Sequence, residues 1–142
     1  MTPTQVESIR ASWTAVEPIQ DVAATLFYDR LFELDPRLRR LFRRTDMAGQ
    51  KKILMQTLTV VVKSLDRVEQ LVPALQAMGR RHAGYGVRPA DYDAVGAALL
   101  WTLGQGLGAG FTPDLRDAWA EAYTLLASVM IDAAREDEAS AA

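Results

Sequence analysis

The chain has 142 residues, 49% of them hydrophobic and 24% charged, with a formal net charge of −2. This length predicts one domain with a core large enough to enclose a ligand, and the slightly acidic balance gives no reason to expect a nucleic-acid partner. The absence of cysteine excludes disulfides and zinc ribbons. With no signal-peptide pattern and no apolar run of membrane-spanning length, we expect a soluble, cytoplasmic protein with no membrane partner.

Helical periodicity and proline positions divide the first part of the chain into short helices. The segment Thr2–Gln5 has the form of a capping box and predicts the start of a first helix. Pro18 predicts the start of a second helix, and Asp35-Pro36 predicts its end and the cap of a short third helix over 37–42. The residues expected to point inward are Val6, Ile9, Trp13, Val16, Val22, Leu26, Phe27, Leu31 and Phe32.

The middle of the chain predicts a loop and two further helices. The polar stretch 43–49 is typical of a loop, and a fourth helix is expected from about Gln50. A fifth helix, from about Val68, ends at His82, and because Pro73 lies within its first turns it either begins late or bends. The apolar residues expected inward on the fourth helix are Leu54, Leu58, Val61, Val62 and Leu65.

Two more helices complete an all-α domain. Pro89-Ala90-Asp91 predicts the start of a sixth helix, which four glycines between Gly104 and Gly110 weaken and then end. Thr112-Pro113-Asp114 is a strong start signal for a last, long helix. No strand pattern competes with these helices. We therefore expect one domain over 1–135 and a flexible tail over 136–142.

His82 is the only histidine and stands directly before the glycine-bearing corner Gly84–Val87. A lone histidine is ordinarily a surface or helix-terminal residue without a special role. One imidazole and no cysteine cannot build a structural zinc site. One imidazole can hold a haem iron, because the porphyrin supplies the other in-plane ligands itself. Both interpretations remain open on these residues alone.

A second polar residue lies at the start of the fourth predicted helix. Gln50 precedes Leu54 by four residues, so the two share one helix face. His82 lies at the end of the next predicted helix. Two such helices facing each other across an apolar slot could place a metal ligand on one side and a polar group on the other.

Several segments, taken in order and with their spacing, resemble the globin family over about residues 4–133. The resemblance is strongest to bacterial single-domain haemoglobins and neuroglobin-like globins. The segments that carry it are Leu26–Pro36, Leu38–Phe42, Met78–His82 with Gly86-Val87, Val95–Leu100, Phe111–Pro113 and Ala118–Tyr123. The resemblance implies a globin fold of about seven to eight helices enclosing a pocket for haem b, iron protoporphyrin IX.

The resemblance also implies roles for individual residues. His82 takes the proximal position and binds the haem iron, while its other ring nitrogen donates to a backbone carbonyl or a nearby side chain. Arg81 either pairs with a haem propionate or is solvated. The remaining residues implied to contact haem are Phe42 as a wedge, Leu54 on the distal side, Met78 and Val87 on the proximal side, and Tyr92 and Val95 along the pocket wall.

Two polar residues match the distal side, where globins bind gases. Gln50 occupies the place of the familiar distal histidine, and Tyr28 matches a second distal position. Two neutral hydrogen-bond donors there would stabilise the partial negative charge of bound oxygen, in a pocket whose low dielectric strengthens such bonds. The alternative is that Tyr28 only packs, with its hydroxyl bonded elsewhere, and that Gln50 turns to solvent.

The chain departs from its apparent relatives in ways that affect chemistry. With one histidine, ligation by histidine from both sides is impossible, so the sixth position is expected to be open, water-bound or taken by an unconventional group. Those groups are Tyr28, Gln50, Lys51 and Lys52. Tyr92 matches a tyrosine that supports the proximal histidine in flavohaemoglobin-like proteins, but Ala134 stands where the accompanying glutamate is expected, which argues against peroxidase-like chemistry.

Three functions are compatible with the resemblance. The first is reversible binding of oxygen, carbon monoxide and nitric oxide for storage or transport. The second is nitric oxide dioxygenase activity, which needs an external reductase because this sequence has no reductase domain. The third is a gas sensor or a haem-free regulatory domain. The arginine cluster within 37–44 could then serve as a partner surface, although a solvated face is its simpler interpretation.

Overall fold

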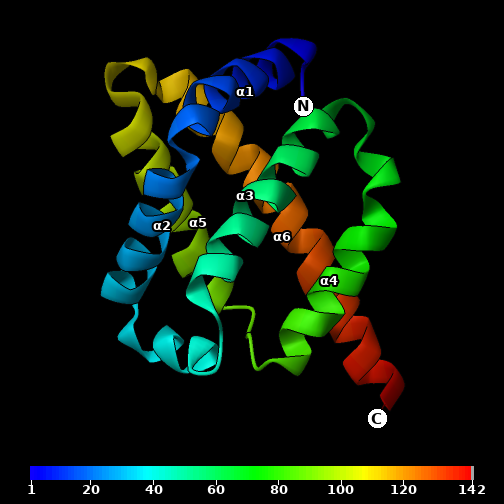
Figure 1. Cartoon of the computed structure of the whole chain (residues 1–142). Helices are drawn as coiled ribbons and strands as arrows, with labels where there is room; N and C mark the ends of the chain where they lie inside the picture. The colour runs from blue at the N-terminus through cyan, green and yellow to red at the C-terminus, as the bar shows by residue number, and fades with distance from the viewer. Residues whose placement is uncertain (142) are drawn as a thin grey trace.

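Helices make up nearly the whole chain in the computed structural model, which describes the backbone of residues 1–141 and the side chains of residues 1–137. The α-helices are α1 (Pro3–Val16), α2 (Gln20–Leu34), α3 (Met47–Lys63), α4 (Val72–Gly84), α5 (Asp91–Leu107) and α6 (Pro113–Ala141). The short 3-10 segments are η1 (Glu17–Ile19), η2 (Pro36–Phe42), η3 (Leu65–Gln70) and η4 (Gly108–Gly110). No strand occurs within residues 1–141, so the all-α prediction is confirmed. Figure 1 shows α3 and α4 as separate ribbons, with α6 passing behind them.

The helix starts follow the predicted capping residues. The hydroxyl of Thr2 accepts a hydrogen bond from the Gln5 backbone N–H (3.1 Å), and the Gln5 side chain accepts one from the Thr2 N–H (2.8 Å). Thr112 caps α6 in the same manner, accepting from the Leu115 N–H at 3.2 Å. Pro18 lies in η1, so α2 itself begins two residues later. These side chains satisfy backbone donors that a helix leaves unpaired at its start.

The predicted loop over 43–49 is too long, because α3 begins at Met47 rather than near Gln50. Asp46 takes the position before the first helical residue, with extended backbone angles (φ −70°, ψ 103°). Met47 packs against the main core. Burial therefore extends the helix toward its N-terminus despite the low helix propensity of Gly49.

The segment that carries His82 also differs from its prediction. The helix begins only at Val72, with Pro73 in its first turn, which confirms the expected late start. Its predicted end at His82 is wrong, because α4 continues to Gly84. The His82 carbonyl then accepts a hydrogen bond from the Val87 N–H (3.0 Å), which closes the corner after the helix.

One predicted inward residue lies outside. Val22 is 59% exposed, whereas its neighbours Ala23 and Ala24 are 3% and 1% exposed. The small alanine side chains allow α2 to pack closely along α5. The inward face predicted for α2 is therefore right along most of the helix. In the first turn it is wrong, because Ala23 and Ala24 are buried there instead of Val22.

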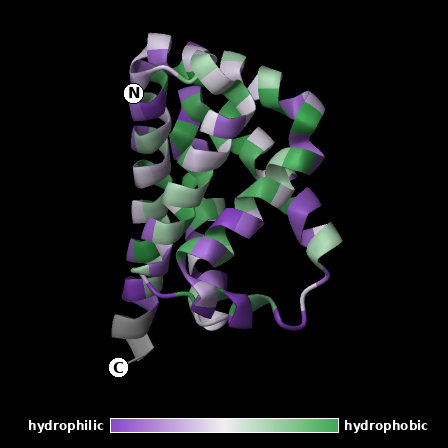
Figure 2. Ribbon diagram, turned by 90° about the vertical axis from the view of Figure 1, so that its left-hand side faces the viewer, coloured by the Kyte–Doolittle hydropathy of each residue, from purple (hydrophilic) through white to green (hydrophobic). Residues whose placement is uncertain are grey.

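The main core joins α1, α2, α3, α5 and α6, and many hydrophobic residues lie in the interior of the ribbon (Figure 2). The indole rings of Trp13 and Trp119 lie 5.9 Å apart between ring centroids. Each indole N–H donates a hydrogen bond, that of Trp13 to Thr59 (3.0 Å) and that of Trp119 to Ser12 (2.9 Å). Buried aromatic rings with satisfied polar atoms give this part of the fold a defined packing.

Helix α4 is attached to the rest of the molecule differently. It packs closely along α6, and within the described residues it makes no comparable contact with α3 or α5. Gly79 permits this approach, since a Cβ atom added there would clash with the carbonyl oxygen of Met130. One side of α4 is thus held firmly while the side toward α3 remains unpacked by other helices.

The lengths of the helices bear on two predictions, the absence of a membrane span and the flexible C-terminal tail. No helix in the described part of the chain is long and apolar enough to cross a membrane. Helix α6 continues to Ala141, and the last residue of the predicted tail, Ala142, lies outside the described residues. The flexibility of the tail and the domain boundary at residue 135 remain predictions.

Substitution of Gly79 tests the close approach of α4 to α6. We expect Gly79→Ala to lower the free energy of unfolding by about 1–3 kcal/mol, because the backbone of Met130 cannot move without shifting α6. Gly84→Ala is the matched control, since no atom lies within 4 Å of a Cβ added there. Urea unfolding followed by circular dichroism measures both variants. Equal stability of the two variants would contradict the packing described.

Candidate functional site

Tyr28, Phe42 and Gln50 come together from three elements. The side-chain Nε2 of Gln50 on α3 donates a hydrogen bond to the hydroxyl oxygen of Tyr28 on α2, at 3.1 Å. The Phe42 ring, at the end of η2, meets the Tyr28 ring edge to face with 5.6 Å between centroids. Phe32 completes the aromatic group, 5.6 Å from Phe42. The structure therefore joins the residues that the sequence placed on the distal side.

The Tyr28 hydroxyl retains its own hydrogen for donation. Tyr28 is 4% exposed, and burial raises the pKa of its phenol above the usual value of 10.0, although the hydrogen bond from Gln50 acts the other way. The phenol is therefore protonated at neutral pH. Because its oxygen accepts from Gln50, the O–H remains directed to some other acceptor. Gln50 itself is half-buried rather than turned fully to solvent.

Leu54 borders an apolar cavity of about 20 Å³ behind the aromatic group. Its walls come from α1, η1, α2, α3 and α5 and include Phe27 and Leu99. The buried hydroxyl of Thr102, on α5, also borders the cavity and has no hydrogen-bond partner among the described residues. An apolar space of this size holds a single small molecule and gives a water few partners.

His82, on α4, uses one ring nitrogen within its own helix. Its Nδ1 lies 2.8 Å from the backbone carbonyl oxygen of Met78. A carbonyl oxygen only accepts hydrogen bonds, so Nδ1 carries the hydrogen and Nε2 presents its lone pair. Burial lowers the pKa of His82 below the usual 6.5, the Met78 hydrogen bond opposes this effect, and the charge of Arg81 adds to the lowering. The imidazole is therefore neutral near pH 7, the form that binds a metal.

The remaining proximal residues form a second apolar group between α4, α5 and α6. Met78, Val87 and Tyr92 pack there around Leu75 and Met130. The hydroxyl of Tyr123 donates to the Tyr92 backbone carbonyl at 2.6 Å, which fixes the start of α5 against α6. A cavity of about 80 Å³ adjoins this group. Its walls are Gly79, Ala83, Val87, Pro89, Tyr92, Ile131, Ala134 and Arg135.

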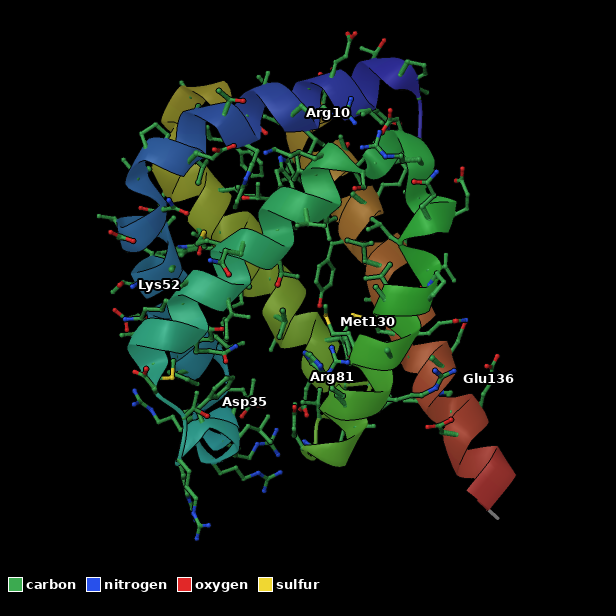
Figure 3. All side chains as sticks on the ribbon, turned by 45° about the vertical axis from the view of Figure 1, so that its right-hand side comes forward. Arg10, Asp35, Lys52, Arg81, Met130 and Glu136 are labelled. Carbon is green, nitrogen blue, oxygen red and sulfur yellow. The ribbon has the colours of Figure 1, made fainter. Side chains whose placement is uncertain are left out.

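The predicted residues thus form two groups, one on α2, η2 and α3 and one on α4 and the start of α5. Val95 is half-buried and packs against the main core, which links α5 to the distal group. Arg81 is exposed, at the lower end of α4 in Figure 3. Phe42, Leu54 and Met78 are only half-buried although they are large and apolar, since α3 and α4 do not cover one another.

This arrangement fits a flat apolar group that brings most of its own metal ligands. No cluster of three or more His, Cys, Asp or Glu side chains occurs in the described part of the chain. The free Nε2 of His82 supplies one nitrogen donor. The half-buried apolar side chains on the facing helices supply the walls. Haem matches both features, because its porphyrin provides the in-plane nitrogens and a large apolar surface.

Sequence reasoning missed several residues that shape this site. Gly79 stood within the segment before His82, but its close approach to α6 has no sequence signal in a single chain. Tyr123 was named only at the end of a segment that carries the family resemblance, whereas its hydroxyl fixes α5. Phe32 was likewise predicted only as an inward residue, and it packs directly against Phe42.

Comparison with known proteins identifies the fold family. The family model described as Globin matches residues 25–130 of this chain. The chain belongs to the globin family. Membership implies a fold that binds haem and diatomic gases.

Individual relatives agree with this assignment. The globin is 31% identical to the neuroglobin of Tetraodon nigroviridis over 137 residues, which covers 87% of this chain and 86% of the relative. It is 27% identical over 128 residues to the flavohemoprotein of Bacillus subtilis, covering 89% of this chain but only 32% of the relative. It therefore spans about a third of that flavohemoprotein.

A solved structure confirms the globin fold. An engineered carbene transferase from Rhodothermus marinus, provisionally assigned as a nitric oxide dioxygenase, superimposes with a TM-score of 0.86 at 27% identity. The match covers 98% of this chain and 96% of that structure. The predicted fold is thus shown, while the role of each pocket residue stays a proposal.

The state of His82 in the haem-free chain can be measured without ambiguity, because it is the only histidine. We expect a pKa below 6.5 and the tautomer with hydrogen on Nδ1, owing to burial and the Met78 carbonyl. Nitrogen-15 chemical shifts of the ring over a pH titration report both properties. A pKa at or above 6.5, or hydrogen on Nε2 at neutral pH, would contradict the site geometry.

Proposed function

We propose that this globin holds haem b through Nε2 of His82 and reversibly binds oxygen and other diatomic gases on the opposite side. The observation that carries the proposal is the hydrogen bond between Gln50 and Tyr28, which gathers two polar groups in an otherwise apolar region. When bound, haem supplies an iron centre to which such gases coordinate. Oxygen binding for storage or transport is the primary function.

The proximal residues orient the imidazole. The Met78 carbonyl accepts the Nδ1 hydrogen and so sets both the tautomer and the ring plane of His82. Met78, Val87, Tyr92 and Val95 line the cofactor's side of the pocket and exclude water. We expect the exposed Arg81 to pair with a propionate of the bound haem.

The distal residues select and retain the gas. Phe42 and Leu54 provide apolar contact, and the Tyr28 O–H is the principal hydrogen-bond donor toward the ligand. Gln50 holds the Tyr28 oxygen and thereby turns its hydrogen away from α3. A buried donor of this kind is effective because no water competes for the acceptor.

Replacement of His82 tests the ligation directly. We expect wild-type protein with one equivalent of haemin to give the spectrum of a histidine-ligated haem in the oxidised, reduced and carbon-monoxide-bound forms. His82→Gly should lose that proximal signature, and added imidazole should restore it. Retention of the wild-type spectra by His82→Gly without imidazole would refute His82 as the ligand. Gln50→Leu serves as a control that keeps the proximal side intact.

Replacement of the distal donors tests gas retention. Tyr28→Phe should speed oxygen dissociation about tenfold, since one hydrogen bond in a buried site contributes about 1–2 kcal/mol. Gln50→Leu should have a smaller effect, because Gln50 acts partly through Tyr28. Carbon monoxide is the internal control, as it carries less negative charge and gains less from a donor. Unchanged oxygen dissociation in Tyr28→Phe, measured by stopped flow, would contradict the assigned role.

A second candidate function is nitric oxide dioxygenase activity with an external reductase. The Tyr28–Gln50 pair favours it, because slow oxygen release leaves time for nitric oxide to arrive, and the flavohemoprotein relatives point in the same direction. Sustained nitrate formation with a reductase would support the enzyme. One stoichiometric burst followed by arrest would favour oxygen binding or sensing. A protein that takes up no haemin would instead support a haem-free regulatory role.

A further inference from the structure

The basic residues of this globin are concentrated in two short segments. Residues 36–52 and 80–88 contain ten of the sixteen lysines and arginines but only one carboxylate, Asp46. The two segments together carry a charge of +9, so the rest of the chain carries −11 to give the total of −2. The positive charge is therefore concentrated in these two segments, although the chain as a whole is nearly neutral.

These basic residues flank the proposed haem site in sequence. Phe42 is followed by Arg43 and Arg44, and Gln50 is followed by Lys51 and Lys52. The proximal side has the same pattern, with Arg80 and Arg81 directly before His82 and Arg88 directly after Val87. A Cβ atom added at Gly86 would lie 3.6 Å from the side chain of Leu41, so η2 and the corner after α4 are neighbours, and their basic residues lie at one end of the molecule. We call these ten basic residues the basic rim; its remaining members are Arg37, Arg39 and Arg40.

Most of the basic rim is exposed and has no carboxylate partner among the side chains that the structure describes. Three members have ion pairs, Arg37 with Asp35, Arg80 with Asp137 and Arg88 with Asp91. The other seven have no carboxylate within 4.0 Å among the side chains that the structure describes. These seven are Arg39, Arg40, Arg43, Arg44, Lys51, Lys52 and Arg81. Figure 3 shows η2 and Arg81 at the same lower end of the molecule.

An exposed aromatic residue lies within the rim. Tyr85 follows α4, is 68% exposed, and its ring centroid lies 6.3 Å from that of His82. Ile53, next to Lys52, is 56% exposed. Exposed tyrosine and arginine side chains are typical of protein interfaces, where they contribute most of the binding energy.

We infer that the basic rim, together with the exposed Tyr85, is the docking surface for an acidic electron-carrier protein. The inference rests on the proposed haem site, because a carrier that docks here would place its own redox group next to the pocket edge. The +9 charge of the two segments that carry the rim fits a partner whose acidic face surrounds its flavin or iron–sulfur group. Such charge complementarity mainly accelerates and orients the encounter.

The charge distribution favours a compact partner over an extended polyanion. A membrane surface or a long nucleic acid presents negative charge beyond the rim, where it would meet the remainder of the chain with its charge of −11. A small acidic protein covers only the rim.

Binding measurements with two acidic carriers test the inference. The probes are an FMN-containing flavodoxin and a [2Fe–2S] ferredoxin, each fluorescently labelled and titrated with haem-loaded globin at low ionic strength. We expect saturable binding of at least one carrier, with affinity falling steeply as salt is added. The variant Arg43→Glu/Arg44→Glu should weaken binding about tenfold or more, and Tyr85→Ala about fivefold.

A matched charge reversal at the other end provides the control. Lys63 and Arg116 are both exposed and lie at the end of α3 and the start of α6, away from η2. Lys63→Glu/Arg116→Glu changes the total charge by the same amount and should leave the affinity within about twofold. Equal weakening by both double variants, or no binding of either carrier, would overturn the inference. So would tighter binding to phosphatidylglycerol vesicles or duplex DNA with the same sensitivity to Arg43→Glu/Arg44→Glu.

The same titration with haem-free globin separates this inference from the proposed function. The basic rim belongs to the chain itself, so a carrier should still bind the haem-free protein. Failure to take up haemin together with selective carrier binding would refute the proposed function but not the docking surface. Normal haem spectra without selective carrier binding would refute the docking surface alone.

Discussion

The site depends on the way in which α4 is held on one side only. Gly79 allows the helix to approach the backbone of Met130, where any Cβ atom would clash, so α4 is fixed along α6. Its opposite side has no comparable contact with α3 or α5 in the described residues. Apolar side chains that would be core residues elsewhere, such as Leu54 and Met78, therefore remain half-buried. A flat apolar cofactor between the helices would complete their burial.

Two hydrogen bonds give the two sides of the proposed haem site different properties, one for binding the metal and one for binding the gas. The Met78 carbonyl determines which nitrogen of His82 is free to bind a metal. The Gln50 amide holds the Tyr28 oxygen and leaves the Tyr28 hydrogen available for a ligand. Burial reinforces both effects, since it lowers the pKa of His82 and raises that of Tyr28, which keeps both groups neutral near pH 7. Each group is thus in the protonation state that its proposed role requires.

The fold and the distal contacts were largely predictable from sequence, while the packing of α4 was not. Capping residues such as Thr2 and Thr112 act locally, so their effect can be predicted without knowing the tertiary structure. The start of α3 at Met47 depends on burial against the core, and local propensity alone placed it too late. The pairing of Tyr28 with Gln50 followed from a family resemblance. The role of Gly79 could not be predicted from the sequence, because a glycine within a helix does not indicate which part of the chain packs against it. The structure shows that this part is Met130 on α6.

Hydrogen exchange along the backbone of α4, with and without one equivalent of haemin, tests the central claim most directly. The account predicts rapid exchange of α4 amides in the haem-free chain, because one side of the helix is unpacked, and strong protection once haemin is bound. Amides of α1 and the middle of α6 should change much less, since their packing is already complete. Protection of α4 that is the same with and without haemin would contradict the proposal that this helix is completed by a cofactor.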